Sequence, residues 1–101
     1  MEFEKYTERA RGFIQNAQTL ALKSKHQQLI PLHILKVLME DREGQSSNLI
    51  DSSGGQSGRV FDAVNAAFLK IPKVEGAGAG KIYIAHETVR LFEQAEQMAE
   101  R

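Results

Sequence analysis

The 101-residue chain contains no cysteine, so a disulfide-stapled secreted scaffold and thiol chemistry are both excluded. It also has no apolar run close to the ~20 residues that span a bilayer, and its charged N-terminal stretch lacks the apolar core of a signal peptide. Neither charge predominates, because 13 basic residues face 13 acidic ones. We therefore expect one soluble, cytoplasmic domain with no membrane partner and no nucleic-acid partner, since nucleic-acid affinity comes largely from a basic face.

Three of the eight glycines lie in the stretch GAGAGK, which raises the question of a phosphate-binding loop. A P-loop has the form G-x-x-x-x-G-K-[ST], and counting back from Lys81 places Glu75 where the first glycine belongs. Ile82 stands where a hydroxyl would hold magnesium. The spacing therefore excludes a nucleotide site, and we interpret residues 74–81 as a mobile linker, because glycine and alanine have little side chain to bury.

The apolar residues recur at helical spacing, which predicts helices throughout the chain. Thr7 is expected to cap the first helix, Pro31 to open the second and Gly44 to stop it. A short third helix, capped by Ser46 or Ser47, should end at the glycine pair 54–55. The fourth should run from about Ser57 to Pro72 and the fifth from about His86 to the end of the chain. The apolar positions expected to face the core are Ala10, Phe13, Ile14, Ala17, Leu20, Ala21, Ile34, Leu35, Leu38, Val60, Val64, Ala67, Phe68, Thr88, Leu91, Phe92, Ala95, Met98 and Ala99.

The first and fifth predicted helices align when one is shifted by 78 positions. Ile14 then falls on Phe92 and Ala17 on Ala95. The alignment indicates an internal repeat, with a second unit that has begun where the chain stops.

Several segments together resemble a known family. The stretch EKYTERARGFIQNAQTLALKSKHQQLIPLHILKVLME, followed by LIDSSGG and LKIPKVEGAGAG, resembles the N-terminal domain of the bacterial Clp ATPase chaperones, most of all that of the disaggregases. The resemblance implies an all-α bundle of about five helices: a first helical repeat over residues 1–75, a glycine-rich linker over 76–82, and the first helix of an incomplete second repeat over 83–101.

The resemblance also implies a function. In that family the domain is tethered to a hexameric AAA+ motor and engages unfolded or aggregated polypeptide. ATP and magnesium belong to the motor, so this chain is expected to bind no cofactor and to catalyse nothing. A helical module that binds an adaptor or a nucleic acid stays open as the alternative, although the balanced charge disfavours nucleic acid.

No catalytic or metal-binding constellation is predicted. The three histidines, His26, His33 and His86, lack the paired spacing of metal ligands, and we expect His33 to make a packing and hydrogen-bonding contact. The acidic residues from Glu40 to Glu43 are typical of an exposed charged turn.

Candidate polypeptide-binding residues are apolar side chains away from the core stripe. Leu22 and Val89 meet this criterion, and Tyr83 and Ile84 lie between linker and helix. Leu91 is included because, by the resemblance, its face is partly covered by helices that this chain lacks. Thr7 has a structural role as a cap and, by the resemblance, a position tied to substrate handling. Scattered exposed apolar residues are also normal on any protein surface.

The apolar face of the fifth helix would be exposed to solvent unless it packs against another surface. It could collapse onto the first four helices, or two copies could associate through it. We favour self-association at high concentration.

Overall fold

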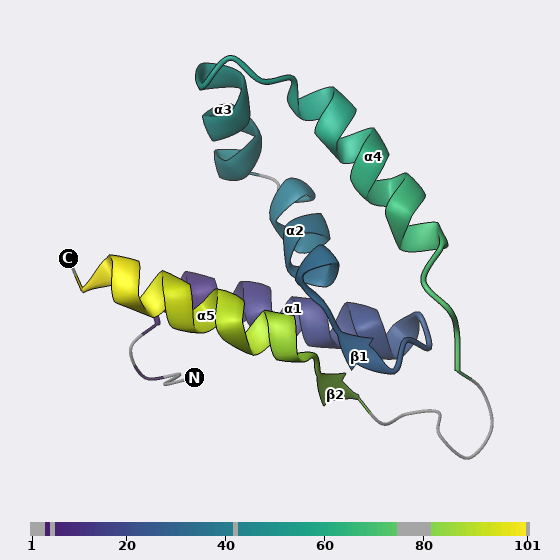
Figure 1. The fold of residues 1–101 in the computed structure, drawn as a ribbon. Coiled ribbons are helices and arrows are strands. Elements are labelled where there is room, and N and C mark those ends of the chain that lie inside the picture. Colours follow the sequence, from purple (N-terminus) through teal and green to yellow (C-terminus); the bar gives the residue numbers. More distant parts are fainter. Residues whose placement is uncertain (1–3, 5, 42, 75–81, 101) are drawn as a thin grey trace.

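The computed structural model describes residue 4 and residues 6–41, 43–74 and 82–100. Along the chain the elements are α1 (Glu8–Lys23), β1 (Gln28–Leu29), α2 (Pro31–Met39), α3 (Gln45–Ser52), α4 (Ser57–Leu69), β2 (Tyr83–Ile84) and α5 (His86–Ala99). The predicted all-α class with five helices is confirmed for this part of the chain (Figure 1). The predicted linker lies outside the described residues apart from its ends, and the division into repeats stays a prediction.

The core lies where α2 packs between α1 and α4. Helix α1 contributes Ile14, Ala17 and Ala21, whose 3–4-residue spacing puts them on one face. The other elements contribute the buried apolar side chains Leu29, Met39, Val64, Ala85 and Phe92 and the buried polar side chains His26, His33 and Thr88. Small side chains on α1 let α2 approach closely.

A two-stranded parallel sheet joins parts of the chain that are far apart in sequence. Gln28 pairs with Tyr83 and Leu29 with Ile84. The N–H of Tyr83 donates to the carbonyl of Gln27 (2.9 Å), and the N–H of Ala85 donates to the carbonyl of Leu29 (3.1 Å). Because β1 leads into α2 and β2 leads into α5, the two helices start side by side (Figure 1).

This sheet corrects the prediction that the chain is helical throughout. Two-residue strands are too short to show the alternation by which strands are recognised in sequence. The pairing nonetheless places the fifth helix beside α2.

Two predicted helix boundaries are wrong. Helix α2 ends at Met39, and Gly44 instead occupies the N-cap position of α3 with φ of +66°, in the left-handed region that favours glycine. No serine side chain caps α3, which begins at Gln45. The predicted end of α3 is confirmed, because Gly54 follows it with φ of +92°.

Several predicted core positions are also exposed. Leu35 and Ala67 face solvent because α2 and α4 bury only part of their apolar faces. On α5, Thr88 and Phe92 are buried as predicted, but the side chains on the rest of the stripe, Leu91, Ala95, Met98 and Ala99, are exposed. The first half of α5 therefore buries its apolar stripe against its own chain, while most of the stripe in the second half is exposed.

Candidate functional site

The two buried histidines form a hydrogen-bonded pair. His33 Nδ1 accepts from the backbone N–H of Ile30 (3.0 Å), so the proton of a neutral ring is on Nε2, which donates to His26 Nδ1 (2.8 Å). The ring of Phe68 packs edge-on against both. Burial lowers the pKa of both histidines, helped by the charge of Lys73 near His26.

The predicted packing and hydrogen-bonding role of His33 is thus confirmed. Its Nδ1 atom accepts from the N–H of Ile30, the N-cap residue of α2, whose apolar side chain cannot accept a hydrogen bond from the helix. Among the residues that the structure describes, no group of three or more His, Cys, Asp or Glu side chains could hold a metal ion.

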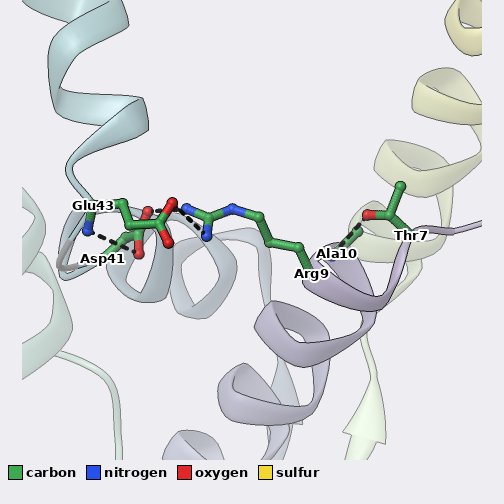
Figure 2. Close-up of polar contacts among 5 residues, drawn as sticks. All are labelled: Thr7, Arg9, Ala10, Asp41 and Glu43. Atoms are coloured by element: carbon green, nitrogen blue, oxygen red, sulfur yellow. Dashed lines mark hydrogen bonds and ion pairs between the residues drawn. The ribbon is translucent and has the colours of Figure 1, made fainter.

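The acidic turn after α2 is an ion-pair site. The guanidinium of Arg9 contacts Asp41 (2.5 Å) and Glu43 (2.9 Å), as Figure 2 shows. It also lies 5.0 Å from the centre of the Phe13 ring. These contacts tie the first turn of α1 to the segment between α2 and α3. Ion pairs this exposed contribute about 0.2–1 kcal/mol each, so they orient the turn more than they stabilise the fold.

Thr7 caps α1, as predicted. Its Oγ1 accepts from the N–H of Ala10 (3.1 Å), and the side chain is exposed (Figure 2). The equivalent N-cap of α5 is Ala85, 78 positions later, which is the offset that aligns the two helices in the sequence. Alanine cannot cap through its side chain, so the two helix starts are stabilised differently.

Tyr6, the residue before Thr7, contacts the second half of α5. The hydroxyl of Tyr6 donates to Glu96 Oε1 (2.7 Å), and its ring packs edge-on against Phe92 at a centroid distance of 6.0 Å. Burial and the carboxylate raise the pKa of Tyr6 to about 12, so the hydroxyl stays protonated and donates. Sequence reasoning missed this residue, because a lone tyrosine ahead of a helix cap carries no periodic signal.

The five predicted binding residues do not form one patch. Leu22, at the end of α1, and Tyr83, in β2, lie toward the same end of the molecule and are 40% and 57% exposed (Figure 1). Thr7 lies at the opposite end of α1. Leu91, on α5, is exposed, whereas Val89 is half-buried, which corrects the expectation that Val89 is a surface residue. Val89 lies one residue from the buried Thr88, where α5 packs most closely on the sheet.

Two adjoining grooves at the end of α4 were not predicted. The first has a volume of about 440 Å³ and the second about 320 Å³, and Ile71 lines both. Leu69, at the last position of α4, lines the second groove and is 85% exposed. The segment LKIPKV gave a usable signal, since its apolar residues follow the helix end and fit no helical stripe.

No helix among the described residues has the length and apolar character that crossing a membrane requires.

Comparison with known proteins identifies the family. A family model described as "Clp repeat (R) N-terminal domain" matches residues 5–101. The chain is 54% identical over 101 residues to a "Chaperone protein ClpB" of Rhodopseudomonas palustris, 46% identical over 101 residues to one of Brucella suis, and 36% identical over 99 residues to one of Rickettsia conorii. These matches cover 100%, 100% and 98% of this chain but only 12%, 11% and 12% of the relatives. The chain therefore spans about an eighth of those chaperones, and it belongs to the Clp repeat N-terminal domain family.

Proposed function

We propose that this chain is the N-terminal recognition domain of a ClpB-type chaperone and that it binds unfolded or aggregated polypeptide without catalysing a reaction. The family and the ClpB relatives support a chaperone role. We further propose that it works in the cytoplasm, joined to an AAA+ remainder that assembles as a hexamer and holds the ATP and magnesium. On this proposal the chain itself binds no nucleotide, in keeping with the failed P-loop spacing.

The observation that carries the proposal is the match of residues 5–101 to the Clp repeat N-terminal domain family, and the exposed apolar side chains agree with it. Unfolded polypeptides expose apolar side chains, so a domain that binds them needs apolar side chains accessible on its surface. Among the described residues, the large apolar side chains with 37–85% of their area exposed are Leu22, Leu35, Leu49, Phe61, Leu69, Tyr83, Ile84, Leu91 and Met98.

These exposed side chains are distributed over several elements, not gathered in one pocket. A domain of this kind would bind weakly and with little sequence preference, because no single site supplies most of the binding energy. Of the predicted binding residues, Leu22, Tyr83 and Leu91 fit this function because their apolar side chains are exposed. Val89 is half-buried and fits only in part, and Thr7 would make a polar contact.

A titration tests the proposal. The isotope-labelled chain is mixed with a permanently unfolded model protein, and amide shifts are recorded by NMR. We expect weak, saturable shifts around Leu22, Tyr83 and Leu91. The native, folded form from which the unfolded model protein is prepared should cause no shifts. Leu91→Ser should weaken binding more than Gln94→Ser, its matched control at an exposed polar position of α5. Absence of shifts at millimolar concentration, or shifts confined to charged surfaces, would refute the function.

A further inference from the structure

Two segments of this neutral chain carry basic residues but no acidic ones. Residues 9–39 contain no aspartate or glutamate, and neither do residues 63–74, which are bounded by Asp62 and Glu75. The carboxylates lie outside these segments, mostly at the chain's beginning, in the turn after α2 and on α5, with Asp51 on α3, Asp62 on α4 and Glu75 after the second segment. The charges are therefore unevenly distributed along the chain, although their total is balanced.

The fold brings the C-terminal end of the second segment against the middle of the first, at the end of α1. The backbone N–H of Val74, beyond α4, donates to the carbonyl of Lys25, beyond α1 (2.7 Å). Lys25 adopts a left-handed backbone with φ of +61°, and this turn reverses the chain between α1 and β1. Figure 1 shows the ends of α1 and α4 approaching each other on this side of the molecule.

Lysines line the grooves at this end. Lys23 and Lys73 line the smaller groove, and Lys70 lines the larger one. Among the described residues, no carboxylate forms an ion pair with any of these three lysines. Their charges are available to a ligand.

The surface between the lysines is apolar. Phe68, Leu69 and Ile71 line the smaller groove, and Ile71 continues into the larger groove beside Ile30 and Val74. Leu69 is the most exposed large apolar side chain among the described residues. The site thus combines apolar contact area with uncompensated positive charge.

A purely structural explanation covers only part of this arrangement. Lysine at the C-terminal end of a helix complements the helix dipole, which accounts for Lys23, in the last turn of α1, and for Lys70, the C-cap residue of α4. It does not account for Lys73, which lies beyond the end of α4, or for the exposure of Leu69 between the lysines.

We propose that these two adjoining grooves bind a polypeptide segment that carries acidic side chains next to apolar ones. The apolar side chains would cover Leu69 and Ile71, and the carboxylates would meet Lys23, Lys70 and Lys73. A nucleic acid fits less well, because the grooves present no arginine and their one aromatic side chain, Phe68, is half-buried beneath the histidine pair. The proposal rests on the proposed function and names the class of segment that this surface prefers.

Matched peptides test the preference. Three extended peptides of equal length share the same leucines and differ only in having glutamate, lysine or glutamine between them, and their affinity for the 101-residue chain is measured by fluorescence anisotropy. We expect the glutamate peptide to bind about tenfold more tightly than the glutamine peptide at low salt, and the lysine peptide to bind least. The advantage of glutamate should shrink as salt rises.

Variants locate the site. The double substitution Lys70→Glu and Lys73→Glu should reverse the order of the glutamate and lysine peptides, while Arg59→Glu, at the exposed opposite end of α4, should change either affinity less than about twofold. Leu69→Ser should weaken all three peptides alike, and because this side chain is already exposed, circular dichroism should show an unchanged fold.

The outcomes separate this proposal from the function on which it rests. If the unfolded model protein binds but the three peptides bind equally, the acidic preference is wrong and the general function stands. If neither the protein nor any peptide binds, the proposed function itself fails. A single-stranded oligonucleotide that displaces the glutamate peptide at equal concentration would also overturn the proposal, by showing that phosphate satisfies the lysines as well.

Discussion

At the scale of single residues, Thr7 combines a structural role with a proposed binding role, and two substitutions separate them. Thr7→Ala removes the acceptor for the N–H of Ala10 and should lower the free energy of unfolding by about 1 kcal/mol. Thr7→Ser keeps the hydroxyl and should restore stability. Urea denaturation measures both variants.

The same two variants test the binding role of Thr7. If its hydroxyl contacts substrate, Thr7→Ala should bind the unfolded model protein more weakly than Thr7→Ser under conditions where both are folded. Equal affinities would limit Thr7 to capping.

The histidine pair predicts a loss of stability in mild acid. The pKa of His26 and that of His33 lie below the unfolded value of 6.5, so the unfolded chain binds more protons as the pH falls through that value. The stability is fully present above pH 6.5 and is lost as the pH falls toward the lowered values of the folded state. Denaturant titrations between about pH 7.5 and about pH 5.5, where most carboxylates stay ionised, should show the decline.

Two further variants assign this pH dependence. His33→Asn keeps an acceptor for the N–H of Ile30 but does not titrate, and it should flatten the decline. His86→Gln alters an exposed histidine and should leave the decline unchanged. A decline of wild-type size in His33→Asn would show that other groups cause it.

At the scale of elements, Thr88 predicts how firmly α5 is docked. Its buried hydroxyl donates to the carbonyl of Leu29 (2.7 Å), which also accepts from the N–H of Ala85. Thr88→Val keeps the shape and removes this bond, which should cost about 1 kcal/mol. Hydrogen exchange should speed up in α5 and β2 and stay unchanged in α1, with Thr88→Ser as the control that retains the hydroxyl. Equal acceleration in α1 would mean that α5 does not open separately.

The elements also show what the sequence could and could not predict. Helix α1 followed from Thr7 and its apolar spacing, and the end of α3 from Gly54, because both signals are local. The strand pair and the Tyr6–Glu96 contact depend on residues distant in sequence, and such pairings leave no local pattern in a single sequence. The exposure of Leu35 and Leu91 shows a further limit, since periodicity indicates an apolar face but not whether another element covers it.

At the scale of the whole molecule, the exposed apolar face of α5 predicts self-association. Leu91 and Met98 are 39% and 71% exposed, and burying such side chains is favourable by about 1.5–3 kcal/mol each when complete. Light scattering across a concentration series should show a rising mass at millimolar concentration. Met98→Glu should keep the chain monomeric, while Gln97→Glu, which adds the same charge next to it, should not. A strictly monomeric wild-type chain would mean that the contacts of α5 with its own chain suffice.

The parallel pairing of β1 with β2 finally implies an order of assembly. The contacts that hold α5 join residues 59 positions apart (Leu29 and Thr88) and 90 positions apart (Tyr6 and Glu96), whereas α1 and α2 are close in sequence. Distant contacts require large loops to close, which costs conformational entropy and slows their formation. Helix α5 should therefore attach last during folding and detach first during unfolding. While α5 is detached, the first four helices remain folded. One edge of β1 and the part of α2 that α5 covers are then exposed to solvent.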